Sequence, residues 1–342
     1  MKGLFKLLSS NPKAMFGLGI IIVFILAAVF APLITQYEPG KRTGNPHEYP
    51  AFVVKAAQDN PDGWIAKNLA TNKRTLLMSK DADHVLGTSR MGRDIWSQLV
   101  YGARTSLAVG FGAGVLVCFL ATIIGISAGY FGGKVDEILT ACMNIMLVMP
   151  QLPILFVIAA FVGQAGPLTI AIVIAVTSWA WGARVVRAQT LSIREKEFVK
   201  AAEVLGESSS RIIFVEILPN LISIVGASFI GSVMYAINVE ATLSFLGLGD
   251  PNGISWGVML YNVQTSSSML IGAWWEVLAP CIALIFIAIG LAMLNFAVDE
   301  IANPQLRSHK GMRRWKNLAK ETEKQEQQVD IIPQPALEGG TK

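Results

Sequence analysis

The residues that most often carry out chemistry in proteins are scarce in this sequence and lie far apart. Three histidines are scattered among polar segments: His47, His84 and His309. Three cysteines lie inside apolar runs and form no CxxC pair: Cys118, Cys142 and Cys281. We therefore expect neither a metal site nor catalytic residues, because metal ligands and nucleophile–base pairs would have to cluster. The cysteines are predicted to be small buried hydrophobes.

Glycine recurs along one apolar stretch, a pattern that can indicate a nucleotide-binding loop. The glycines concerned are Gly110, Gly112, Gly114, Gly125 and Gly129. No Lys-Ser or Lys-Thr follows them, and the G-x-x-x-x-G-K-[ST] pattern of a phosphate-binding loop occurs nowhere in the sequence. Close packing of apolar helices explains these glycines better. We expect this chain to bind no cofactor.

The most unusual ionisable residue is Glu240, which interrupts an apolar run. An ionisable side chain in such a run is costly, so it usually faces a partner or a cavity. Two interpretations stay open. Glu240 is either a gate or pathway residue, or it pairs with a neighbouring subunit or a backbone group near the end of its helix. The other candidate pathway residues are Asn238, Met234 and Asn144.

Composition indicates the elements that must position these residues. The chain has 342 residues, of which 53% are hydrophobic and only 15% charged, whereas a soluble domain carries about 25% charged residues. A helix that spans a membrane needs about 20 mostly apolar residues. Six segments qualify: 14–34, 106–130, 135–163, 168–186, 221–248 and 275–298. The prediction is an all-α integral membrane protein with six transmembrane helices. Pro150 and Pro153 favour a bend within the third.

Positive charge predicts the orientation. Lysine and arginine concentrate on one side of a six-helix chain: Lys2, Lys6, Lys13, Lys134, Arg184, Arg187, Arg194, Lys196, Lys200, Arg211, Arg307, Lys310, Arg313, Arg314 and Lys316. The short loops on the other side carry none. Because positive charge is retained in the cytoplasm, both termini are predicted to be cytoplasmic. The polar stretch 35–104 is also basic, but loops of more than about 60 residues lie outside this rule.

This interpretation divides the chain into four parts. Residues 1–34 hold a cytoplasmic N-terminus and the first transmembrane helix, which is too long for the apolar core of a signal peptide. Residues 35–104 form an extracytoplasmic arm that ends in an interfacial helix. Residues 105–298 form a five-helix core, and residues 299–342 form a cytoplasmic tail whose end is expected to be disordered.

The charged segment 184–220 lies between the fourth and fifth apolar segments. Helical spacing of apolar residues predicts a first short helix over 197–205. Gly206 is predicted to break the chain there, and a serine in 207–210 is a candidate N-cap of a second short helix. We expect Pro219 to end that second helix.

This segment resembles the "EAA" loop of ABC-importer permeases, with a Glu-Ala-Ala motif, a glycine and a later Leu-Pro. Five positions match: Ala201, Ala202, Gly206, Leu218 and Pro219. Two differ, since Lys200 stands where the family often has Glu and Glu216 where it often has Ile. The resemblance implies that residues 197–219 form a cytoplasmic coupling helix that docks on an ATPase subunit.

The stretch 84–107 resembles the segment before the second helix in the C-type permease of oligopeptide and dipeptide importers. The matching positions are Gly87, Thr88, Gly92, Arg93, Asp94, Ser97, Gly102, Arg104 and Ser106. Ser89 and Gln98 differ from the family's usual Asp and Arg. Arg93 and Asp94 could fix the start of the interfacial helix. We expect Gly92, Arg93, Asp94 and Arg104 at the extracytoplasmic side, where they either contact the solute or hold a plain interfacial helix.

A third match is EATLSFLGLG at 240–249, followed by Pro251 and Trp256-Gly257. Together, the resemblances imply a type I ABC importer permease in the inner membrane, most similar to peptide permeases. They imply a second, homologous permease, two ATP-binding subunits that hold ATP and Mg, and an extracytoplasmic solute-binding protein. No nucleic-acid partner is expected.

Other functions stay open at this point. The same importer branch also carries oligosaccharides and nickel. A stand-alone secondary transporter would need several charged residues deep in its spans, and apart from Glu240 these are nearly absent. A membrane-embedded enzyme would need a catalytic constellation, but none of the six apolar segments contains a histidine.

Overall fold

The computed structural model describes residues 12–71, 83–163 and 166–302, and is helical throughout most of them. The chain divides into two units, Met1–Val298 and Asp299–Lys342, and the helical bundle belongs to the first. Within the described residues the only β pairing is a single antiparallel bridge between Thr88 and Asp94. The predicted N-terminal end up to residue 11 and the predicted disordered tail beyond residue 302 lie outside these residues.

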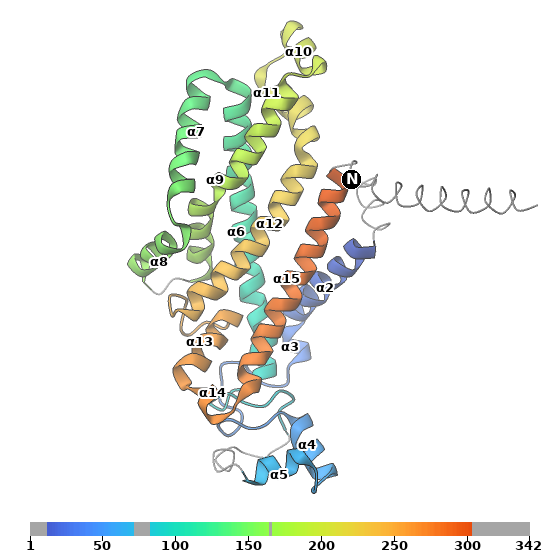
Figure 1. The fold of residues 1–342 in the computed structure, drawn as a ribbon, viewed down its shortest axis with the longest axis vertical. Coiled ribbons are helices and arrows are strands. Elements are labelled where there is room, and N and C mark those ends of the chain that lie inside the picture. Colours follow the sequence, from blue (N-terminus) through green and yellow to red (C-terminus); the bar gives the residue numbers. More distant parts are fainter. Residues whose placement is uncertain (1–11, 72–82, 164–165, 303–342) are drawn as a thin grey trace, which may run out of the picture. The chain divides into compact units, whose positions relative to one another are not determined.

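Long apolar helices dominate the first unit (Figure 1). Five described helical runs are long and apolar enough to cross a membrane. They are α2 (Pro12–Val29), α6 (Ile95–Phe131), α9 (Pro167–Arg194), the run Ser209–Phe245 containing α12 (Leu218–Phe245), and α15 (Trp274–Ala302). A bent pair, α7 (Gly133–Val148) and α8 (Gln151–Val162), makes a sixth if it counts as one span. The prediction of six apolar spans is confirmed on these terms.

The third predicted helix bends more sharply than a kink. The axes of α7 and α8 differ by 87° at a break of two residues, Met149 and Pro150. Proline has no N–H and its ring clashes with the preceding helical turn, and the residue before a proline favours extended backbone. Met149 is indeed extended (φ −70°, ψ 135°). The prolines therefore end α7 and begin α8 in a new direction.

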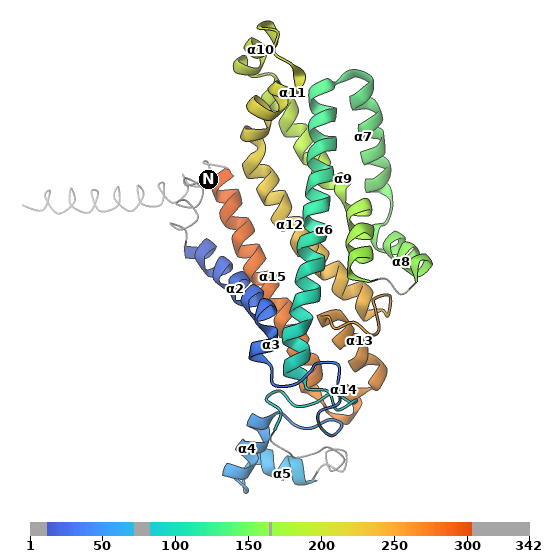
Figure 2. The same cartoon turned by 180° about the vertical axis from the view of Figure 1, so that it is seen from behind.

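Helix α6 is the centre of the packing, and both α9 and α12 run along it (Figure 2). Its glycines allow the close approach. A Cβ placed on Gly114 would lie 2.5 Å from Val233 of α12, and one on Gly125 would lie 2.6 Å from the carbonyl oxygen of Ala183 in α9. Gly112 is the exception, since a Cβ there would meet nothing. The predicted packing role of the glycines is thus confirmed for most of them.

The prediction that all three cysteines are buried holds for Cys118 alone: Cys142 is exposed on α7, and Cys281 is partly buried. Met143 is the one buried residue of this apolar helix. An apolar pattern in a membrane protein marks lipid-facing positions as well as core positions, because lipid is as apolar as the core.

The predicted boundary between an interfacial helix and the second span does not exist. Helix α6 is continuous over 37 residues, about 55 Å at 1.5 Å per residue, and therefore crosses the division that we placed after residue 104. It begins where Asp94 accepts a hydrogen bond from the Ser97 backbone N–H at 2.7 Å. The predicted role of Asp94 as the start of the helix is confirmed.

The end of the unit around the start of α6 holds short helices, α4 (Ala51–Asp59) and α5 (Trp64–Thr71) (Figure 1). The region 249–274, between the fifth and sixth apolar segments, also contains helices: α13 (Trp256–Ser266) and α14 (Ser268–Ile271). Ser255 caps α13 by accepting a hydrogen bond from the Val258 N–H at 3.2 Å. The sequence signal for α13 is a serine, a preferred N-cap residue, followed by eleven residues without proline.

Candidate functional sites

At the opposite end from α4, a small helix connects two spans (Figure 1). Helix α9 extends to Arg194, past the predicted end at 186, and is followed by α10 (Glu197–Val204). Gly206 turns the chain with φ +79°, where any residue with a Cβ would be strained. Ser208 then caps α11 (Ser209–Arg211). The predicted short helix, glycine break and serine cap are confirmed.

Pro219 does not end a helix, contrary to prediction. Residues Ile212–Ile217 form a π-helix that runs directly into α12, with Pro219 in the first turn of α12. The wider π turn takes the Leu218 N–H to the Ile213 carbonyl. Proline is tolerated in a first helical turn because its missing N–H is not needed there. Asn220 also donates its side-chain amide to the Glu216 carbonyl oxygen at 2.6 Å.

One face of helix α10 packs against the bundle, and the other face is exposed. Val199 is fully buried in a cluster with residues of α6, α9 and α12, including Ile126, Val186 and Leu221. On the outside, Val204 is 87% exposed and Leu205 is 80% exposed. Exposed apolar side chains gathered on one element indicate a surface that binds a partner.

The motif residues of this segment divide between that surface and the bundle. Ala201 is exposed, Ala202 is half-buried and packs in the cluster of Val199, and Leu218 does the same. The Lys200 ammonium lies 2.7 Å from the Glu195 carboxylate, and its hydrogen bond holds the pKa of Glu195 below its usual value. Lys200 is thus oriented by a neighbour on its own surface. The sequence analysis did not single out Val204.

A cavity of about 500 Å³ opens between the spanning helices. Its polar lining comes from hydroxyl and amide groups of α8, α9 and α12: Gln151, Ser178, Ser228, Ser232 and Tyr235. The Tyr235 hydroxyl donates to the Gln151 side-chain oxygen at 3.1 Å. No charged residue is among those that line this cavity. The arrangement offers hydrogen bonds to a polar solute without favouring either sign of charge.

None of the four predicted pathway residues lines this cavity. Asn144 accepts a hydrogen bond from Arg184 of α9 at 2.6 Å. Asn238 is exposed and donates to the Met234 carbonyl oxygen at 2.8 Å. The Met234 side chain packs against the buried core next to α6.

Glu240 lies in the seam where α6, α12 and α13 meet, and is 1% exposed. Ser106 and Ser244 donate hydrogen bonds to its two oxygens, at 3.0 and 2.9 Å. The Ser106 hydroxyl in turn accepts one from the Trp256 N–H at 3.3 Å. Both carboxylate oxygens are hydrogen-bonded within the described residues, and a cavity of about 60 Å³ adjoins the side chain.

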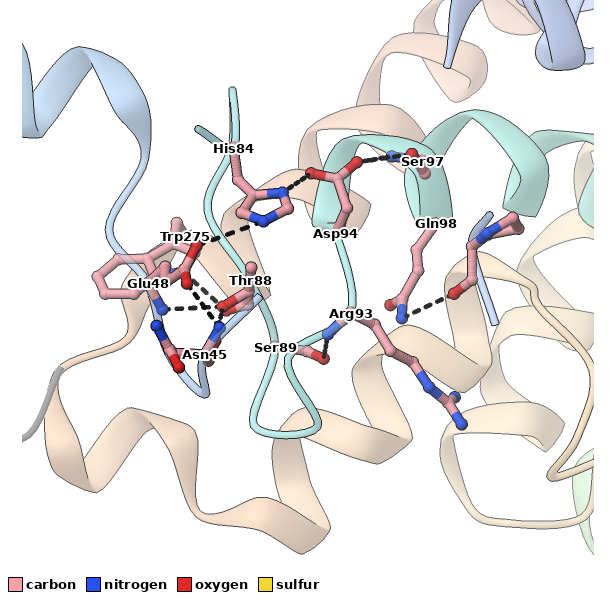
Figure 3. Close-up of polar contacts among 11 residues, drawn as sticks. Asn45, Glu48, His84, Thr88, Ser89, Arg93, Asp94, Ser97, Gln98 and Trp275 are labelled. Carbon is pink, nitrogen blue, oxygen red and sulfur yellow. Dashed lines mark hydrogen bonds and ion pairs between the residues drawn. The ribbon is translucent and has the colours of Figure 1, made fainter. Parts of the chain in front are cut away.

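A buried polar network joins the arm to α6 and α15 (Figure 3). His84 lies between two carboxylates: its Nδ1 is 2.9 Å from Asp94 and its Nε2 is 3.3 Å from Glu48. Thr88 accepts a hydrogen bond from the Glu48 N–H at 2.9 Å and donates to the Asn45 carbonyl oxygen. The sequence analysis did not find Glu48 or a role for His84, because Glu48 lies far from His84 along the chain and Asp94 lies on the far side of a tight turn.

The remaining predicted residues of this end have different environments. Gly92 has φ +67° and its carbonyl oxygen accepts hydrogen bonds from the Thr43 and Gly44 N–H groups. The Arg93 side chain points away from the network (Figure 3). The Arg104 guanidinium lies over the Tyr101 ring at 5.7 Å, a cation–π contact. Asp94 alone belongs to the buried network.

Spanning helices around a cavity with hydroxyl and amide groups in its wall, with a helix at one end that exposes apolar side chains, are features of a multi-pass membrane transport protein. A family profile described as binding-protein-dependent transport system inner membrane component matches residues 121–308. A second, described as the N-terminal transmembrane domain of oligopeptide transport permease C, matches residues 2–50. The chain belongs to the family of binding-protein-dependent transport system inner membrane components. It is a multi-pass inner-membrane permease component rather than a catalytic subunit.

Relatives cover most of the chain. It is 32% identical to the dipeptide transport system permease protein DppC of Alkalihalophilus pseudofirmus, over 89% of this chain and 90% of that protein. It is 34% identical to the oligopeptide transport system permease protein OppC of Bacillus subtilis, over 73% and 72%. It is 26% identical to the di/tripeptide transport system permease protein DppC of Pseudomonas aeruginosa, over 90% and 93%.

Proposed function

We propose that this chain is a transmembrane permease subunit of an ATP-driven importer for short peptides. The observation that carries the proposal is α10, a helix between two spans that is anchored by Val199 and leaves Val204 and Leu205 bare. The peptide permeases among its relatives support the substrate. Oligosaccharides and nickel, carried by the same importer branch, are the alternative substrates.

The proposed partners follow from the same surface. Helix α10 docks on one of two ATP-binding subunits, which hold ATP and Mg, while this chain holds no cofactor. A second, homologous permease completes the membrane pathway, and a solute-binding protein delivers the peptide from outside. Both termini lie in the cytoplasm, because α10 and the basic segment around it must face the ATP-binding subunits.

The cavity between α8, α9 and α12 is this chain's part of the solute pathway. Its hydroxyl and amide groups suit a peptide, whose backbone repeats hydrogen-bond donors and acceptors whatever its side chains. The absence of charge among its lining residues suits solutes of either sign. Glu240, Asn238, Met234 and Asn144 therefore serve the structure of the helices around the pathway.

Leu205→Glu tests the docking surface. It places a charge on the bare apolar face without disturbing the Val199 anchor, and we expect loss of ATP-binding subunits from the purified complex and at least tenfold slower uptake. Glu203→Gln, also exposed on α10, is the matched control and should retain both. Full subunit occupancy and normal uptake in Leu205→Glu would contradict the proposal. So would uptake that persists when the ATP-binding subunits are deleted, which would indicate a secondary transporter.

A further inference from the structure

A second cavity, of about 310 Å³, lies at the end of the unit that holds the start of α6. It is bounded by the turn 89–93, the first turns of α6, the last turns of α13 and the start of α15. Of its nine lining residues only Met91 is apolar. Unlike the cavity between the spans, this cavity is lined by charged residues.

Two arginines supply the positive charge of this cavity. Arg90 and Arg93 line it, and neither side chain has an ion pair or hydrogen bond with any residue of the described ranges. The cavity's one carboxylate, Glu276, is already engaged: its oxygens lie 2.6 Å from His47 Nδ1 and 2.9 Å from the Ser268 hydroxyl, which donates to it. Arg90 is exposed to solvent and Arg93 is half-buried, so their guanidinium groups are the charged groups of the cavity that can reach a ligand.

The backbone that carries these arginines is fixed before any ligand arrives. The Gly92 N–H donates to the Ser89 carbonyl oxygen at 2.8 Å, and the Ser89 N–H donates to the Arg93 carbonyl oxygen at 2.9 Å. The Gly92 carbonyl oxygen accepts from two N–H groups of the arm. A turn held at both ends loses little freedom when its side chains bind, so binding costs less.

We propose that this cavity binds the terminal carboxylate of the transported peptide, with Arg90 and Arg93 as its ligands. A guanidinium offers paired N–H donors that match a carboxylate. Asn262 and Thr265 of α13, which line the facing wall, are placed to hydrogen-bond the peptide backbone. A concave cavity of this size fits a short peptide end rather than the flat surface of a docked protein. The inference rests on the proposed peptide function and adds a loading site to it.

The test uses the complete importer in liposomes, with both permeases, the ATP-binding subunits and the solute-binding protein. Uptake of tri-alanine is compared with uptake of tri-alanine amide, which lacks the carboxylate, for wild type, Arg90→Gln/Arg93→Gln and Lys55→Gln. Lys55 is exposed on α4 and does not line the cavity. We expect the double variant to lose about tenfold in kcat/KM for the free acid, as for the loss of one charge-assisted hydrogen bond, with amide uptake and the Lys55 control unchanged.

Three results would overturn the inference. An unchanged ratio of acid to amide uptake in the double variant shows that the arginines do not read the solute. An equal loss for both peptides, with a higher concentration of solute-binding protein needed for half-maximal ATPase activity, assigns the arginines to docking of that protein. An equal loss with less assembled importer assigns them to folding. Failure of the wild type to take up either peptide refutes the proposed peptide function itself.

Discussion

Replacing His84 with alanine removes the imidazole ring that lies between two buried carboxylates. His84 is 2% exposed, and both of its ring nitrogens face carboxylate oxygens, of Asp94 and Glu48. His84→Ala leaves both carboxylates without the ring that faces them.

The loss of His84 affects the two carboxylates differently. Asp94 keeps the Ser97 N–H and hydroxyl as donors, at 2.7 and 2.6 Å. The Glu48 oxygen that faces His84 has no hydrogen-bond donor among the described residues, and its polar contact there is His84 Nε2 at 3.3 Å. Removing the group that faces a buried carboxylate costs about 3–5 kcal/mol. At the lower end, the opened form of the arm becomes more than about a hundredfold more populated, at 1.4 kcal/mol per factor of ten.

Hydrogen exchange of the detergent-purified protein measures that opening directly. The Ala51 and Thr88 N–H groups, which donate to the carbonyl oxygens of His84 and Glu48, should exchange much faster in His84→Ala, while amides in the middle of α6 keep their protection. Glu48→Gln is the matched control: its side-chain amide keeps a polar group facing the His84 ring, so we expect a loss of about 1 kcal/mol. Equal protection in His84→Ala and wild type, or equal damage in both variants, would refute the reasoning.

Three further changes test the packing and the pathway. Gly114→Leu forces side-chain atoms against Val233 of α12 and should destabilise the protein by about 1–3 kcal/mol, measured as a lower melting temperature, while Gly112→Leu, at an open position, should not. Glu240→Leu leaves the hydroxyls of its seam unpaired, so we expect a loss of about 1–3 kcal/mol in stability with normal uptake per folded complex; abolished uptake at full stability would restore the gate interpretation. Ser232→Trp fills the cavity between the spans and should block uptake without releasing the ATP-binding subunits, and normal uptake would exclude this cavity from the pathway.

The sequence predicted what depends on local chemistry. Runs of apolar residues predicted the spans, Gly206 predicted a turn, and Asp94 predicted the start of α6. Each of these follows from properties of the residue and its immediate neighbours. The sequence could not predict contacts between distant segments. The sequence left two interpretations of Glu240 open, because one of its two hydrogen-bond donors, Ser106, lies 134 positions away in the chain.

The apolar pattern also could not distinguish lipid from core. Cys142 and Met143 are neighbours in one apolar run, but only Met143 is buried. The sequence also did not predict the polar residues that line the cavity between the spans. Ser232 and Tyr235 are common in spanning helices, and their convergence with Gln151 depends on the 87° bend before α8, whose angle no residue pattern encodes.

The incorrect prediction that Pro219 ends a helix matters most, because it concerns how the α10 segment is connected to the cavity between the spans. A helix that ended at Pro219 would separate the α10 segment from α12 by a flexible joint. Instead, the π turn of Ile212–Ile217 passes into α12 without a break, and α12 continues to Ser232 at the wall of the cavity between the spans. Under the proposed function, a displacement of α10 reaches the pathway because Val199 packs against the run that begins at Ser209, and that run continues without a break to the cavity wall. The proline changes the hydrogen-bond register locally but preserves the mechanical connection.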